Sequence, residues 1–402
     1  MSRIPAFSNT TWTHIYRFIA WHLMSQMGFG GAIWILYLQH RGYSLGQIGL
    51  AEAIFHLAPI LLEVPSGTFA DLVGRRWSLV VSSTLVFLSS ILMISAATLP
   101  IVMVAMFMQG ASYSFRSGAD QAFLFDTLTA DQRSRYGKVF GRLLSAGYVL
   151  AGAATWIGAW LSERSYAIPY ALSAITALCG ILLAFGLAEP PRETLHTGER
   201  GIGSHFRQVR TVLRDRPAVA LMLFIASAFW VMVTISDLYA QAVFSERGLT
   251  NGQVGLLMGT MFLAIAAGTA VGGQLGRGFA WQWPILAIIT GAGIILIGYE
   301  VLAVALIAFV ISQFVTGIVE TRLSAWYNIQ LPPSQRATVL SIESWLFSCF
   351  MIGLFPLGGW FAGRAGWSAL YLVCGLIVML TALALLVLRS HPDKTDEPSL
   401  NV

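Results

Sequence analysis

The stretch AVALMLFIASAFWVMVTISDLYAQAVFS, residues 218–245, contains a single charged residue, Asp237. An α-helix needs about 20 mostly apolar residues to cross the hydrocarbon core of a bilayer, so this stretch predicts a transmembrane helix. The whole chain of 402 residues has the same character, with 56% hydrophobic and 11% charged residues, whereas soluble domains carry about 25% charged residues. This composition excludes a soluble enzyme, a disordered regulator and a small disulfide-built domain.

Twelve apolar runs of helical length follow one another along the chain, six before and six after a long polar stretch. They are expected at 15–40, 45–70, 78–98, 100–128, 138–161 and 167–188, and then at 218–245, 251–275, 283–299, 302–330, 337–362 and 368–388. We therefore expect an all-α integral membrane protein with twelve transmembrane helices in two pseudo-symmetric six-helix bundles. The expected parts are a first bundle at 1–188, a basic cytoplasmic linker at 189–216, a second bundle at 217–389 and a cytoplasmic tail at 390–402.

Positive charges are distributed unevenly between the predicted loops. If the N-terminus lies inside, the inner segments hold 16 of the 24 Lys and Arg residues and the outer loops hold 4. Lys and Arg are enriched in the cytoplasmic loops of membrane proteins, so both termini are expected in the cytoplasm. This topology accounts for the net charge of +5, and we expect the lipid bilayer, not nucleic acid, to be the partner of the basic segments.

Motifs of other protein classes are missing from the sequence. The three cysteines, Cys179, Cys349 and Cys374, lie inside apolar runs and have no disulfide or metal-ligand spacing. There is no phosphate-cradling P-loop, no nucleophile elbow and no HExxH pair. We expect neither an enzyme nor ATP-driven chemistry in this chain, and we expect no cofactor, no metal and no obligate protein partner.

The two halves of the chain repeat each other. RGYSLGQIGL at 41–50 matches RGLTNGQVGL at 247–256, with the same residue at most positions. Gly74-Arg75 falls on Gly276-Arg277, and Gln132-Arg133 falls on Gln335-Arg336, at nearly the same offset. Three matches in order favour a duplication. Two similar six-helix halves usually place a substrate site between them near the middle of the membrane.

The loop after the second predicted span reads GTFADLVGRR, from Gly67 to Arg76. This G-x3-D-x2-G-R-R pattern, between spans two and three of a twelve-span chain, resembles the signature motif of the major facilitator superfamily. The resemblance covers the whole chain, because six plus six spans, a basic central linker and a degenerate second copy are also typical of that family. The segments 63–67 and 117–120 are similar to a prokaryotic branch near the drug/proton antiporters.

The resemblance implies a conformational latch, formed by Gly67, Asp71, Gly74, Arg75, Arg76 and Asp126. Gly67 is expected to let helices approach closely and Gly74 to permit a sharp turn. In the family, the acid of the motif faces the N-terminus of the eleventh span, and the loop arginine pairs with an acid at the cytoplasmic end of the fourth. Asp126 occupies that place here, so an Arg75–Asp126 pair is expected. In the second copy of the motif, Gly273 stands at the position that corresponds to Asp71. We therefore expect a single latch, which lies in the first half of the chain.

The sequence also departs from the antiporter pattern. The fifth span, GRLLSAGYVLAGAATWIGAWL, has the glycines of the antiporter motif but no proline, which is a departure from the pattern of the exporters. The fourth-span arginine of proton-coupled members precedes a Gln-Gly pair, whereas Gln109-Gly110 comes before Arg116 here. Because Arg116 does not match the position of that arginine in the motif, the resemblance does not assign the family role to Arg116.

Charged residues inside predicted spans are costly and are functional candidates by default. The candidates for proton and substrate binding are Asp237, Asp120, Glu320, Arg116, Arg322, Glu63 and Glu343. Arg116 and Asp120 are four residues apart, which would place them on one face of a helix. Static buried ion pairs that fix helix packing are the alternative interpretation of these charges. Glu52 and Glu300 lie nearer the outer interface and are expected to be solvated.

Aromatic residues are abundant, and some are placed where a cavity is expected. The candidates are Trp34, Tyr113, Trp230, Trp326 and Tyr327. Aromatic rings together with a carboxylate would suit a lipophilic cation through stacking and cation–π contact. His22 is expected to be a hydrogen-bonded helix residue rather than a proton relay.

Together these features indicate a secondary transporter of a bacterial cytoplasmic membrane that works by alternating access. The favoured interpretation is proton-coupled export of a small amphipathic or cationic compound, in which Asp237, Asp120 and Glu320 share proton and substrate binding and the proton gradient supplies the energy. An alternative is uptake of a metabolite or anion with protons, in which Arg116 and Arg322 would be ligands. A more distant alternative is a non-transporting membrane receptor or an intramembrane enzyme.

Overall fold

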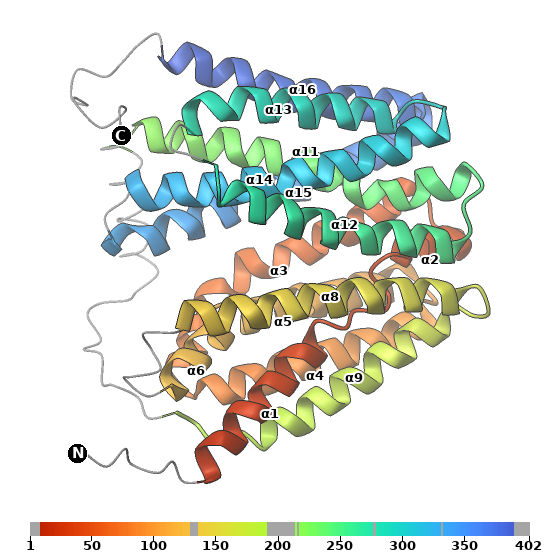
Figure 1. Cartoon of the computed structure of the whole chain (residues 1–402). Coiled ribbons are helices and arrows are strands. Elements are labelled where there is room, and N and C mark those ends of the chain that lie inside the picture. The colour runs from red at the N-terminus through yellow and green to blue at the C-terminus, as the bar shows by residue number, and fades with distance from the viewer. Residues whose placement is uncertain are drawn as a thin grey trace. The chain divides into compact units, whose positions relative to one another are not determined.

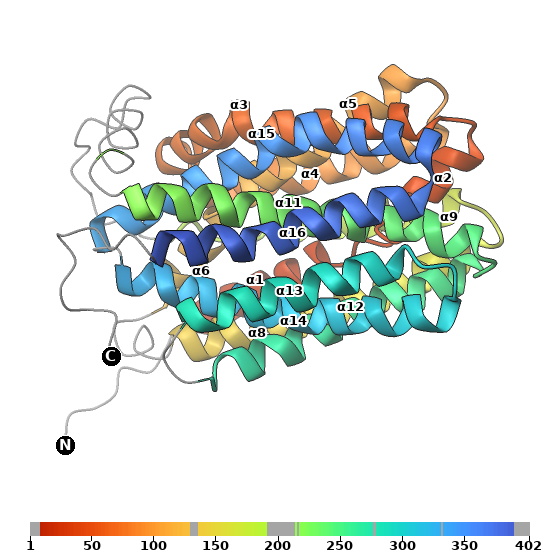
Figure 2. The same ribbon diagram turned by 90° about the horizontal axis from the view of Figure 1, so that it is seen from above.

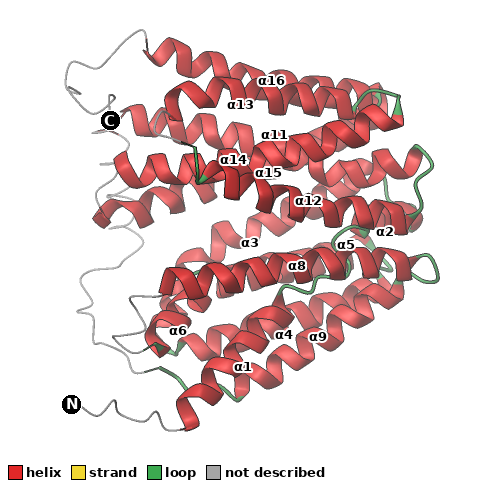
Figure 3. Cartoon of the chain, in the orientation of Figure 1, coloured by secondary structure: helices red, strands yellow, loops and turns green. Residues whose placement is uncertain are grey.

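The computed structural model describes residues 9–128, 136–190, 214, 217–275, 279–330 and 333–389. These residues form α-helices joined by turns and loops, and no strand occurs among them (Figure 3). The predicted all-α class is therefore confirmed. The predicted tail and most of the predicted linker lie outside the described residues, as do Arg133 and Arg277.

The helices account for the twelve predicted membrane spans (Figure 1). Spans one and four each consist of two helices, which are α1 (Asn9–Ser25) with α2 (Trp34–His40) and α5 (Leu99–Arg116) with α6 (Ala119–Thr127). The other spans of the first half are α3 (Leu45–Leu72), α4 (Arg75–Ser95), α8 (Tyr136–Ser162) and α9 (Ala167–Phe185). Those of the second half are α11 (Pro217–Glu246), α12 (Asn251–Gly272), α13 (Phe279–Ile297), α14 (Leu302–Gln330), α15 (Pro333–Ala365) and α16 (Trp367–Arg389). Within the described ranges, eight helices are individually long and apolar enough to cross a membrane.

The chain divides into two compact units. Unit 1 contains residues 1–32 and 54–198, and unit 2 contains residues 33–53 and 199–402. The segment 33–53, which holds α2 and the first turns of α3, therefore groups with the second half of the chain. One reason is that α2 packs against α11, where the backbone N–H of Ile35 donates to Oε1 of Gln241 (3.4 Å).

In unit 1, α4 packs against both α9 and α5. An aromatic cluster joins α1 to α6 beside these helices, with Phe18 stacked on Phe123 at a centroid distance of 5.2 Å. The neighbouring Trp21 is buried, and its indole N–H donates to Oγ of Ser83 on α4 (2.9 Å). Close packing and interhelical hydrogen bonds of this kind hold helices together in a membrane, where lipid is as apolar as the helix surface.

Unit 2 repeats the same pattern of helix packing. There α13 packs against both α16 and α14 (Figure 2). The third span thus contacts the fourth and sixth in unit 1, and the ninth span contacts the tenth and twelfth in unit 2. Equivalent helices of the two halves therefore have equivalent packing partners, as the internal repeat predicts.

Two glycines let α12 and α14 approach closely within unit 2. Gly268 on α12 faces the carbonyl oxygen of Phe314, and Gly317 on α14 faces the carbonyl oxygen of Ile265. A methyl group at either glycine would overlap backbone atoms of the neighbouring helix. Small residues at such positions are the usual means of close backbone approach between membrane helices.

We expect Gly317→Ala to lower the free energy of unfolding by about 1–3 kcal/mol, because the added methyl group would force the two helices apart. Thermal unfolding in detergent, followed by tryptophan fluorescence, would show this as a lower Tm. Gly353→Ala is the matched control, since a Cβ at this helical glycine would have no atom within 4 Å. Equal Tm values for the two variants would contradict the close-packing role.

Candidate functional site

The helices of spans one and four are interrupted in unit 1, and several polar side chains lie close together at these interruptions. In span one, α1 ends at Ser25 and turns follow over residues 26–33. In span four, α5 ends at Arg116, and Gly118 has a φ of +75°, a left-handed conformation that favours glycine. The prediction that Arg116 and Asp120 share one helical face is therefore wrong, because the helix stops between them and restarts as α6.

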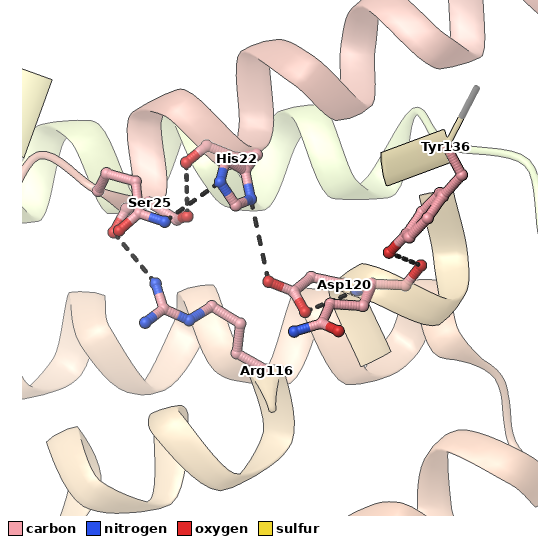
Figure 4. Close-up of polar contacts among 7 residues, drawn as sticks. His22, Ser25, Arg116, Asp120 and Tyr136 are labelled. Atoms are coloured by element: carbon pink, nitrogen blue, oxygen red, sulfur yellow. Dashed lines mark hydrogen bonds and ion pairs between the residues drawn. The ribbon is translucent and has the colours of Figure 1, made fainter. Parts of the chain in front are cut away.

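The two interruptions bring four polar residues of unit 1 together (Figure 4). Nη1 of Arg116 donates to the backbone carbonyl of Ser25 at the end of α1 (3.5 Å). Oδ2 of Asp120 lies 3.9 Å from Nδ1 of His22. Oδ1 of Asp120 accepts from the N–H of Gln121 (2.7 Å) and so satisfies a donor in the first turn of α6. Arg116 and Asp120 are thus brought near His22, for which the sequence predicts only a hydrogen-bonded helix residue.

Asp237, a predicted proton- and substrate-binding residue in unit 2, has a side-chain hydrogen-bond partner on a neighbouring helix. It is partly buried on α11, and its Oδ1 accepts a hydrogen bond from Nε2 of Gln313 on α14. Oε1 of Gln313 is buried and has no hydrogen-bond partner among the described residues. Sequence reasoning missed Gln313, although a polar residue inside the predicted tenth span was a visible signal.

The other charged candidates of unit 2 have different surroundings. Glu320 is exposed on α14, whereas Glu343 on α15 is partly buried and acts electrostatically on Tyr327. Nε of Arg322 donates to Oε1 of Gln282 (2.7 Å), and its Nη1 donates to the carbonyl of Leu275 (2.9 Å). Arg322 is therefore held by protein acceptors and ties α14 both to α13, through Gln282, and to the segment after α12, through Leu275.

The two glutamates on α3 have different surroundings, and the role predicted for Glu63 stays a prediction. Glu63 is partly buried in unit 1. Glu52 belongs to unit 2 and is 7% exposed, so the expectation of a solvated side chain is wrong. The reason is that the first turns of α3 pack into unit 2, where Glu52 acts electrostatically on Tyr239. Glu300, by contrast, is exposed as expected.

Of the five aromatic residues predicted to line a cavity, Tyr113 lies in unit 1 and is exposed, and the other four lie in unit 2. Those four contact neighbouring rings, with Trp34 against Phe355, Trp230 against Phe229 and Trp326 against Tyr327. Tyr327 is buried, and its hydroxyl has no hydrogen-bond partner within the described part of the chain. A role in substrate binding stays a prediction for all five.

The signature loop contains the predicted ion pair. The guanidinium of Arg75 pairs with the carboxylate of Asp126, and its Nη1 also donates to the carbonyl of Ala122 (2.7 Å). Gly74 has a φ of 140° where the loop turns into α4, as the predicted sharp turn requires. The close approach predicted at Gly67 is not found, because a Cβ there would meet no described atom within 4 Å.

A carboxylate that sequence reasoning missed also holds this loop. Glu189, just after α9, accepts from the backbone N–H of Arg75 with Oε1 (2.7 Å) and from that of Arg76 with Oε2 (3.0 Å). A negative charge at a helix N-terminus satisfies otherwise unpaired N–H groups and is favoured by the helix dipole. The side chain of Arg76 lies over the ring of Trp77, at 5.1 Å from the centroid. Asp71 is exposed at the end of α3, and its predicted contact with the eleventh span stays a prediction.

Comparisons with known proteins agree with this architecture. A family model described as the Major Facilitator Superfamily matches residues 19–326 and 238–401. The uncharacterized MFS-type transporter YxaM of Bacillus subtilis is 34% identical over 112 residues, which are 28% of this chain and 27% of YxaM. The quinolone resistance protein NorA of Staphylococcus aureus is 20% identical over 174 residues, which are 43% of this chain and 44% of NorA. The alignments thus span less than half the length of either relative.

Solved structures share the fold at low sequence identity. The nucleoside transporter NupG superposes with a TM-score of 0.74 at 12% identity, covering 94% of this chain and 99% of that one. A bacterial homolog of the human lysosomal transporter Spinster gives a TM-score of 0.71 at 16% identity, covering 95% and 96%. The matches of the family model, together with the twelve helical spans, establish that this chain belongs to the Major Facilitator Superfamily and is a multi-pass membrane protein.

Proposed function

We propose that this transporter exports a small amphipathic or cationic compound in exchange for protons, by alternating access of its binding site to the two sides of the membrane. In this proposal the protein lies in a bacterial cytoplasmic membrane with both termini inside. The proton gradient supplies the energy, and no cofactor takes part. The similarity to a quinolone resistance protein supports export over uptake.

The hydrogen bond between Asp237 and Gln313 is the observation that carries the proposal. Asp237 is the single charged residue of 218–245, and its partner is a neutral amide. A carboxylate inside a membrane is costly, and either a proton or a cationic substrate can neutralise it. Because the two compete for one carboxylate, binding of one favours release of the other, which is the coupling that antiport requires.

Gln313 can serve both protonation states of Asp237. Its Nε2 donates to the ionised carboxylate, and after the amide turns over, its Oε1 can accept from a protonated carboxyl group. The buried Oε1 is without a hydrogen-bond partner in the described structure, so this acceptor is available. The pair can therefore lose or gain a proton without leaving the carboxyl group unpaired.

Arg116 favours a second candidate function, which is the uptake of an anion together with protons. Its one hydrogen bond among the described residues is the long contact with Ser25, so guanidinium donors remain for an anionic substrate. Arg322 is already held by two protein acceptors and suits this role less well. Arg116→Gln would damage anion uptake more than cation export, and this difference separates the two candidates.

We expect Asp237→Asn to abolish proton-coupled export, because an amide can neither carry a proton nor pair with a cation. Everted membrane vesicles with a respiration-driven pH gradient, monitored by a quenched acridine dye, would show proton release on addition of tetraphenylphosphonium or a fluoroquinolone. Wild-type vesicles should respond, and Asp237→Asn vesicles should not.

The matched control for this experiment is Glu300→Gln, which makes the same carboxyl-to-amide change at an exposed loop position. It should respond like the wild type. Normal proton release by Asp237→Asn, at equal expression, would remove Asp237 from the mechanism. Failure of the wild type together with proton-driven uptake of an anion would support the second candidate.

We also propose that the Arg75–Asp126 pair, which ties the start of α4 to α6, acts as a latch that biases the outward-facing against the inward-facing state. Gly67 and Asp71 lie in the last turns of α3, Gly74 lies in the turn before α4 and Arg76 lies in the first turn of α4. We propose that these four residues set the position of Arg75. The bidentate contact of Glu189 with the first N–H groups of α4 supports this role, because it fixes the backbone from which the arginine extends.

Arg75→Gln and Asp126→Asn should each slow turnover by about fivefold or more, which corresponds to about 1 kcal/mol, with little change in substrate Kd. The double variant should be no slower than either single variant, because the two side chains act as a unit. Transport rates and equilibrium binding in proteoliposomes would measure both quantities. Arg164→Gln, an exposed arginine over Trp160, is the control. Additive losses in the double variant would contradict the latch.

A further inference from the structure

Unit 1 holds a buried ionisable group that the proposed function leaves unused, which is the imidazole of His22. This residue lies in the last turn of α1, directly before the interruption of span one, and is 1% exposed. Its ring packs against the rings of Phe18 and Trp21, at centroid distances of 6.2 and 6.5 Å. A polar ring in such apolar surroundings needs hydrogen-bond partners, because an unpaired buried polar group is costly.

One ring nitrogen of His22 has such a partner and the other does not. Nε2 lies 3.3 Å from Nε2 of Gln26, one turn further along the chain. Nδ1 is buried and has no hydrogen-bond partner in the described part of the chain. An amide nitrogen can only donate, so in this arrangement the imidazole Nε2 is an acceptor, and a neutral ring carries its proton on Nδ1.

The proton on Nδ1 points to a carboxylate that lies slightly beyond hydrogen-bond distance. Oδ2 of Asp120 is 3.9 Å from Nδ1 (Figure 4). The other oxygen of Asp120 is already used, because Oδ1 accepts from the N–H of Gln121. A shift of about 1 Å between α1 and α6 would bring Nδ1 and Oδ2 to an ordinary hydrogen-bond distance.

Few other ionisable groups occur in the described parts of the helices packed around this pair, and those of α4 are Arg75 and Arg76 in its first turn. Arg116 on α5 acts electrostatically on both His22 and Asp120. From α8, the hydroxyl of Tyr136 donates to the carbonyl of Gln121 (3.4 Å). The same helix carries Arg142, which is exposed. The sequence of α9, which also packs on α1, contains no Asp, Glu, Lys, Arg or His.

We propose that His22 and Asp120 together form a proton site of the transporter separate from Asp237. The imidazole takes up one proton at Nε2, and the imidazolium then donates its Nδ1–H to Oδ2 of Asp120. The proton comes from water and returns to water during the transport cycle. In the loaded state Nδ1 and Oδ2 share one hydrogen bond, and Nε2 of the imidazole carries a proton. That Nε2–H donates to Oε1 of Gln26 after the amide has turned over. The inference rests on the proposed proton coupling and extends it to unit 1.

Loading this site would also change the structure around it. His22 lies at the end of α1 and Asp120 at the start of α6, so the hydrogen bond from Nδ1–H to Oδ2 in the loaded state joins the interruptions of spans one and four. Interrupted helices in transporters commonly hold the coupling ion or the substrate at such points. The proton would therefore draw together two half-helices that the unloaded structure leaves 3.9 Å apart at these atoms.

The first test needs no substrate. Histidine labelled with ¹⁵N in protein reconstituted into nanodiscs reports which ring nitrogens carry protons, and loss of a signal in His22→Gln assigns His22. We expect Nε2 of His22 to change from unprotonated to protonated on acidification within about pH 8 to 5, the range in which histidine sites usually respond. The change should be absent from that range in Asp120→Asn. A wild-type Nε2 that keeps one state throughout the range would overturn the proposal.

The second test separates coupling from binding. In proteoliposomes, His22→Gln should reduce export driven by an imposed pH gradient at least about tenfold, whereas its gradient-free exchange of labelled tetraphenylphosphonium should stay within about twofold. Asp120→Asn should reduce driven export to the same extent. A purely structural role would lower both activities. His40→Gln, an exposed histidine at the end of α2, is the matched control and should retain both.

The outcomes distinguish this inference from the proposed function. Driven export that persists in His22→Gln, or parallel loss of export and exchange in both His22→Gln and His22→Asn, would overturn the proton site. If wild-type protein exchanges the cation but ignores the pH gradient, the proposed proton coupling fails, and the nitrogen spectra still decide whether His22 and Asp120 bind a proton.

Discussion

The requirement that every backbone N–H and C=O group find a partner inside the membrane governs this structure. Lipid offers no hydrogen bonds, so a spanning segment is helical unless other protein groups satisfy the backbone where the helix stops. Two spans of unit 1 do stop, and polar side chains are found at both places. Arg116 reaches the last carbonyl of α1, and Asp120 satisfies an N–H group in the first turn of α6. The interruptions therefore explain why charged residues are concentrated there.

The two units handle their ionisable groups in a similar way despite different residues. In unit 1 an imidazole lies against Gln26, and in unit 2 a carboxylate lies against Gln313. A side-chain amide offers a donor at one end and an acceptor at the other, so it can serve an ionisable group both with and without its proton. Fixed cationic partners would hold one protonation state instead. Neutral glutamine partners are thus compatible with groups that change charge during a transport cycle.

The signature loop shows how a local motif depends on distant parts of the chain. The spacing of Gly74 and Arg75 sets the turn and the direction of the arginine, and the sequence alone supports both. The pairing with Asp126 was predicted from resemblance to a family, and the structure contains it. The contact of Glu189 with the first N–H groups of α4 was not predictable in this way. It joins residues more than one hundred positions apart, and Glu189 carried no signal except its place after the sixth span.

The sequence by itself determined the membrane class and the twelve helical spans, because an apolar run of this length can satisfy its backbone hydrogen bonds in lipid as a helix. It also identified Asp237 as an isolated charge. Only the tertiary structure decided which candidates meet. It separated Arg116 from Asp120 by a helix end, buried Glu52 in unit 2, and brought Gln313 to Asp237 and Asp120 near His22. Hydrophobic periodicity specifies that a segment is helical and buried, but side-chain partners depend on where helices end and how they pack, and those are set by contacts between distant residues.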